Sequence, residues 1–76
     1  MSQEAPGFRV VDVECHAGYR AEETPRRFRV ADRQVEIVEL VKSWLEPDYR
    51  YFKVRDTLGD LYILRNDVAS DRWELM

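Results

Sequence analysis

The sequence contains few of the residues on which metal sites and nucleophilic catalysis depend. Its 76 residues include one cysteine, Cys15, and one histidine, His16. A single cysteine excludes an internal disulfide and predicts a reducing, cytoplasmic location. One cysteine and one histidine cannot complete a zinc site unless a second chain supplies ligands, so we expect no bound metal.

Glycine and long apolar runs are also scarce. Gly18 and Gly59 are isolated turn residues rather than parts of a phosphate-binding loop, so we expect no cofactor. No apolar stretch approaches the length of a transmembrane helix, and "MSQEAPG" lacks the basic and apolar regions of a signal peptide. We therefore expect no membrane partner, a flexible tail over residues 1–7 and a single small domain over residues 8–76.

The charge of the chain is modest but uneven. A net charge of −3 argues against a protein that attracts nucleic acid through its overall field. Residues 26–33, however, contain four arginines and one aspartate, which leaves room for a basic strip on a mildly acidic body.

Alternation of apolar and polar residues predicts several short strands. In "FRVVDVECH" the residues Val11, Val13 and Cys15 share one face, while Phe8 and Val10 fall on the other phase. This change of phase predicts a bulge near Val10 and Val11. Pro25 marks the start of the next strand, because proline lacks the N–H that a strand interior needs.

The last third of the sequence predicts a hairpin. "RYFKVRD" and "DLYILRND" are separated by a turn at Gly59, so Phe52 and Val54 should lie opposite Tyr62 and Leu64. "RWELM" then returns as a short strand with its tryptophan and leucine on one face.

Residues 34–45 fit two structures. Their apolar residues cluster on one side of a helix, yet many are β-branched and also fit a strand whose phase slips once. We therefore predict a mainly β fold, an antiparallel meander of five to six strands forming a partly open barrel or roll. The alternative is an α+β fold with a helix at 34–45.

Most of the chain resembles a known family. The order "GYRAEETPRRF", Trp44, "YFKVR", "GDLYILR" and "DRWEL" resembles a family of small bacterial proteins of unknown function. From "PRRF" onward it is also similar to a C-terminal segment of some Y-family DNA-polymerase-like proteins. In the family the stretch matching 34–45 is a strand, so the resemblance favours the strand. It transfers no catalytic residue.

The stretch "ECHAGYRAEETPRR" collects reactive residue types without forming a catalytic site. Adjacent strand residues point to opposite faces, so Cys15 and His16 cannot act together as nucleophile and base. The paired acids of this stretch and of residues 36 and 39 are expected on solvated faces. We expect no catalytic residue and no enzymatic activity.

A surface stripe is the stronger candidate for a binding site. If the hairpin buries Phe52 and Leu64, its other face carries Leu61 together with the five residues of the predicted binding surface: Tyr51, Lys53, Arg55, Ile63 and Arg65. Cations beside an aromatic ring suit single-stranded nucleic acid, although the cations can instead cover apolar neighbours. A secondary patch of four residues is predicted around the loop: Tyr19, Arg20, Arg26 and Arg27.

These patterns predict a small binding or interaction module without catalytic activity. Its partner is single-stranded nucleic acid or another protein, and the open sheet edges also allow a homodimer. A small ligand-binding protein or enzyme is the third alternative.

Overall fold

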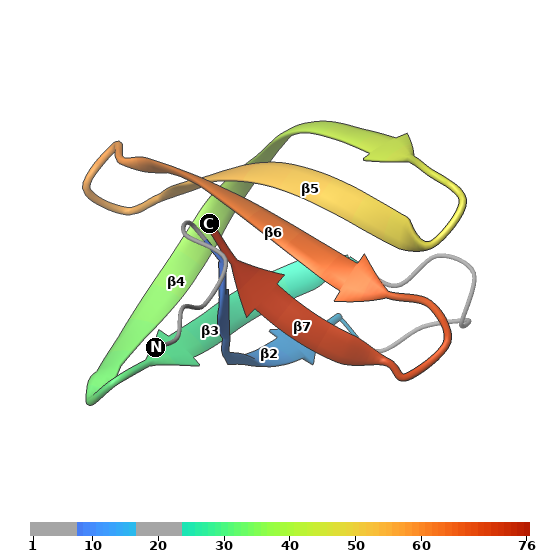
Figure 1. Ribbon diagram of the computed structural model, residues 1–76. Helices are drawn as coiled ribbons and strands as arrows, with labels where there is room; N and C mark the ends of the chain where they lie inside the picture. The colour runs from blue at the N-terminus through green and yellow to red at the C-terminus, as the bar shows by residue number, and fades with distance from the viewer. Residues whose placement is uncertain (1–7, 17–23) are drawn as a thin grey trace.

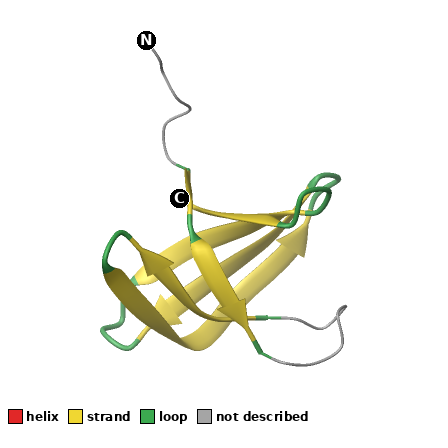
Figure 2. Ribbon diagram, turned by 90° about the horizontal axis from the view of Figure 1, so that it is seen from below, coloured by secondary structure: helices red, strands yellow, loops and turns green. Residues whose placement is uncertain are grey.

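The computed structural model describes residues 8–16 and 24–76, which form an antiparallel β-sheet without any helix (Figures 1 and 2). The strands are β1 (Arg9–Val10), β2 (Asp12–Cys15), β3 (Pro25–Val30), β4 (Arg33–Leu45), β5 (Tyr49–Asp56), β6 (Leu61–Asp67) and β7 (Arg72–Leu75). Their order across the sheet is β1-β7-β6-β5-β4-β3-β2.

The sheet curls into a nearly closed barrel because the first strand is divided at Val11. Before this residue β1 pairs with β7, and after it β2 pairs with β3. The N–H of Val11 donates a hydrogen bond of 3.1 Å to the carbonyl of Trp73 at the seam. The predicted irregularity near Val10 and Val11 is thus the point where the meander closes on itself.

The predicted mainly β, partly open barrel is confirmed. The described residues form seven strands rather than five or six, because the single strand expected over residues 8–16 is split in two. The alternative helix at 34–45 is wrong, since these residues lie in β4. Pro25 begins β3, as its missing N–H predicts.

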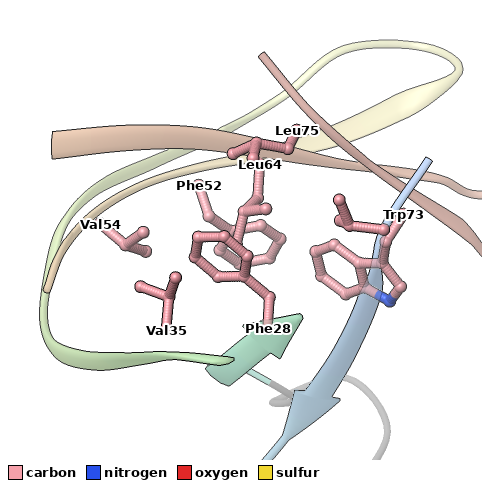
Figure 3. Packing of buried hydrophobic residues seen from close by; sticks show 8 residues of the cluster. Phe28, Val35, Phe52, Val54, Leu64, Trp73 and Leu75 are labelled. Atoms are coloured by element: carbon pink, nitrogen blue, oxygen red, sulfur yellow. The ribbon is translucent and has the colours of Figure 1, made fainter. Parts of the chain in front are cut away.

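The core lies between the facing walls of the barrel (Figure 3). Phe28, Val54 and Leu64 are the largest fully buried side chains. Phe28 packs edge-on against Tyr62, with ring centroids 5.2 Å apart, and Phe52 packs against Trp73 at 5.5 Å. The core is therefore small and held largely by aromatic rings, as a chain of this length requires.

The β5–β6 hairpin has the predicted register. Phe52 lies opposite Leu64 and Val54 lies opposite Tyr62. Gly59 has a φ of +89° in the connecting turn, a conformation that glycine adopts without strain.

Some predictions concern residues outside the described ranges. The expected tail over residues 1–7 and two members of the secondary patch, Tyr19 and Arg20, lie there. Within the described part of the chain, no helix is long and apolar enough to span a membrane.

Candidate functional site

The structure places the predicted binding surface on the outer face of the β5–β6 hairpin. Tyr51 lies opposite Arg65, and Lys53 lies opposite Ile63. Side chains alternate along both strands, so the burial of Phe52 and Leu64 directs these four residues outward. Arg55, opposite Leu61, completes the surface at the turn end of the hairpin.

A row of aromatic side chains crosses this outer face. Trp44 of β4 stacks on Tyr51 of β5, with ring centroids 5.1 Å apart and planes within 3° of parallel. Tyr49 follows at 6.0 Å from Tyr51. Phe8, ahead of β1, lies on the same face, and we call these four residues the aromatic row.

Arg65 lies between two members of the row, Phe8 and Tyr49. Its guanidinium carbon is 3.8 Å from the ring centroid of Phe8 and 4.0 Å from that of Tyr49. Its Nε donates a hydrogen bond of 2.6 Å to Oε1 of Glu74 on β7. Burial opposes the charge of Arg65, but the bonds to Glu74 and Tyr51 outweigh it and raise its pKa. Through these contacts Arg65 connects Phe8, at the start of the described chain, to β5 and β7.

The other cations of this face differ in their availability. Arg55 is ion-paired with Glu39 of β4, its Nε lying 2.9 Å from Oε1. Within residues 8–16 and 24–76, Lys53 forms no ion pair. Lys42 of β4 places its Nζ 5.5 Å from the centroid of the Trp44 ring. The cations best able to contact an anionic ligand here are thus Lys53 and Lys42, which lie opposite each other on β5 and β4.

Of the secondary patch, only Arg26 and Arg27 lie within the described residues. Arg27 forms ion pairs with residues of two neighbouring strands. Its Nη1 donates to Glu14 at 2.8 Å and its Nε to Glu36 at 2.9 Å, which joins β2, β3 and β4. The hydrogen bonds from Glu14 and then Glu36 raise the pKa of Arg27, and Arg27 lowers that of Glu36. Arg26 is exposed at the bulge between β2 and β3.

The structure places Cys15 and His16 in different surroundings. Cys15 packs against the core while His16 is exposed, as their neighbouring positions on a strand predict. Across the described residues, no three His, Cys, Asp or Glu side chains gather in a way that could hold a metal ion.

Three members of the aromatic row are absent from the predicted binding surface. Tyr49 could have been found by extending the alternation of Tyr51 and Lys53 backward by two residues. Trp44 could not, because two register shifts in β4 decide which face it occupies. Phe8 reaches the row only through the pairing of β1 with β7, which local pattern does not reveal.

Comparison with protein-family models, curated proteins and solved structures found no match to this chain.

Proposed function

We propose that this protein is a non-catalytic module that binds single-stranded nucleic acid on the outer face of β4, β5 and β6. The observation that carries the proposal is the parallel stack of Trp44 on Tyr51 next to Lys53 and Lys42. Both rings are half-buried, so each is held by the sheet while part of its surface stays accessible. The proposal includes a cytoplasmic location, which the single cysteine favours.

The chemistry of this face suits a flexible, anionic and aromatic ligand. A base can stack on a tryptophan or tyrosine ring, and each such contact contributes about 1 to 3 kcal/mol in single-strand binders. Lys53 and Lys42 would contact the phosphates on either side of the stacked base. A duplex conceals its base faces, so single strands should bind more tightly. The resemblance to a polymerase-tail segment supports the same class of partner.

Fluorescence anisotropy of short labelled oligothymidine and oligouridine tests the proposal at two salt concentrations. We expect binding that weakens with salt, because lysine contacts release counterions from the strand. Trp44→Leu should weaken binding by about tenfold, and Trp44→Phe should restore part of the loss. Lys53→Gln should reduce the slope of log affinity against log salt by about 0.7.

Arg29→Gln is the matched control for Lys53→Gln. It removes the same charge from an exposed position on β3, two strands away from β5 in the sheet. The salt slope should stay at the wild-type value in this variant. An absence of salt-dependent binding at tens of micromolar protein would contradict the nucleic-acid proposal. Equal losses in Arg29→Gln and Lys53→Gln would contradict the assigned surface.

A further inference from the structure

The second half of β4 is a sheet edge. β3 pairs with β4 only over Arg33 to Glu36, and β5 pairs with its other side from Ile37 to Leu45. Among the described strands, none pairs with the free side of β4 beyond Glu36. An edge of this length presents unpaired N–H and C=O groups that can pair with another chain.

The side chains along this edge are unusually apolar for an exposed strand. Four large hydrophobic residues are exposed there: Val38 at 61%, Leu40 at 42%, Val41 at 39% and Leu45 at 77%. Natural edges are commonly protected by charged side chains, prolines or bulges. Here the two charged residues of the free edge, Glu39 and Lys42, are separated by two apolar residues.

The irregularities of β4 bring these two charges to the same face. The register with β5 shifts between Ile37 and Glu39 and again between Leu40 and Lys42. In a regular strand, residues three apart point to opposite faces. Because of the shift at Val41, Glu39 lies opposite Arg55 and Lys42 opposite Lys53, and both point outward.

We propose that this edge pairs antiparallel with the same edge of a second copy, around a two-fold axis between Leu40 and Val41. In this register Glu39 of each copy faces Lys42 of the other, and Leu40 faces Val41. Moving the axis by half a residue in either direction separates both Glu–Lys pairs and places a charge opposite an apolar residue. Charge complementarity therefore selects a second copy of this chain, in one register, as the occupant of the edge.

Such a pairing joins two barrels through a continuous sheet. It buries the exposed valines and leucines of β4 and satisfies the backbone groups of both edges at once. It does not depend on the proposed function. In the dimer Lys42 pairs with Glu39 of the other copy, whereas Lys53 and the stacked Trp44 and Tyr51 rings stay on the outer face of the joined sheet. The two copies would carry their nucleic-acid surfaces side by side.

Sedimentation velocity over protein concentrations from about 1 to about 500 μM tests the dimer by mass action. We expect the mass to rise from 9.1 kDa to twice that value. Glu39→Lys and Lys42→Glu should each raise the dissociation constant by about tenfold or more, because each change creates two like-charge contacts.

An equimolar mixture of the two variants tests whether the two charges face each other across the dimer. A heterodimer of Glu39→Lys with Lys42→Glu restores opposite charges at both positions, so the mixture should associate more tightly than either variant alone. Circular dichroism should show the same β spectrum for all variants. A wild-type monomer at every concentration would overturn the proposal. So would a dimer that neither reversal weakens, or a mixture no tighter than its components.

Discussion

The hydroxyl of Tyr62 donates a hydrogen bond of 2.9 Å to Oδ2 of Asp56 at the base of the β5–β6 turn. The other carboxylate oxygen of Asp56 accepts bonds of 2.9 Å from the N–H groups of Leu58 and Asp60. Only 4% of Asp56 is exposed, so three hydrogen-bond donors of the protein replace water around this carboxylate. Burial and the bond to Asp56 raise the pKa of Tyr62.

The bonds to Asp56 predict a loss of stability in acid. Burial alone would raise its pKa, but the donors from Asp60, Tyr62 and Leu58 lower it below the ordinary value of 3.8. As the pH falls, the unfolded chain therefore takes up a proton before the folded one does. The stabilisation is present above the ordinary pKa and is lost as the pH falls through the folded value.

Urea denaturation as a function of pH checks this prediction. Asp56→Asn should lower the free energy of unfolding at neutral pH and weaken its decline in acid. Part of the decline should persist, because Arg27 also lowers the pKa of Glu36. Asp60→Asn is the control, since it keeps the N–H that bonds Asp56 and should keep the wild-type acid dependence. An unchanged acid dependence in Asp56→Asn would refute this role.

The barrel core should tolerate little loss of volume. Leu64 is fully buried, so Leu64→Ala should lower the free energy of unfolding by about 2 to 5 kcal/mol. For a domain of this size that is a large part of the total stability. Leu58→Ala provides the comparison, because Leu58 is 78% exposed and its truncation should change stability by less than about 0.5 kcal/mol. Equal effects in the two variants in urea would contradict this description of the core.

The β3–β4 turn should gain stability from a glycine. Ala31 has a φ of 54°, the left-handed region in which an L-residue is strained by about 1 to 2 kcal/mol. The added freedom of glycine in the unfolded chain offsets part of this strain. Ala31→Gly should therefore raise the free energy of unfolding by about 0.5 to 1 kcal/mol, measured by urea denaturation.

Asp32→Gly is the control for the turn. Asp32 is not among the residues with positive φ, so glycine there brings only its conformational freedom and should destabilise the fold. A gain of stability in Asp32→Gly, or a loss in Ala31→Gly, would show that the strain at Ala31 does not govern this turn.

Local pattern was sufficient to predict the elements that keep a strict period of two. Phe52 and Val54 face the core and Lys53 faces outward, so the β5–β6 hairpin and the face of its stripe follow from the residues alone. Residues 11–15 keep the same alternation, and the change of phase before them predicts the irregularity at Val11.

The same reasoning could not decide β4, and the two register shifts explain why. They place Ile37, Leu40 and Ser43 opposite the buried residues Asp56, Val54 and Phe52, a spacing of three that imitates the period of a helix. The position of Trp44 on the outer face depends on these shifts too. The sequence pattern does not predict the open edge of β4 either, because this edge depends on the residue at which β3 stops pairing with β4.

Arg65 should contribute to stability, whereas Lys53 should contribute to binding. Arg65→Gln removes the guanidinium between Phe8 and Tyr49 and the ion pair with Glu74, so it should lower the free energy of unfolding by about 1 to 2 kcal/mol. Lys53→Gln removes no ion pair within the described residues and should change stability by less than about 0.5 kcal/mol.

Single-strand affinity should show the opposite order, because the guanidinium of Arg65 already lies between two rings and a carboxylate. At a temperature where both variants are folded, anisotropy titrations should show a shallower salt slope for Lys53→Gln and an unchanged slope for Arg65→Gln. If Arg65→Gln instead lowered the slope as much as Lys53→Gln, Arg65 would contact phosphate directly. Its contacts with Phe8 and Glu74 would then have to open when the nucleic acid binds.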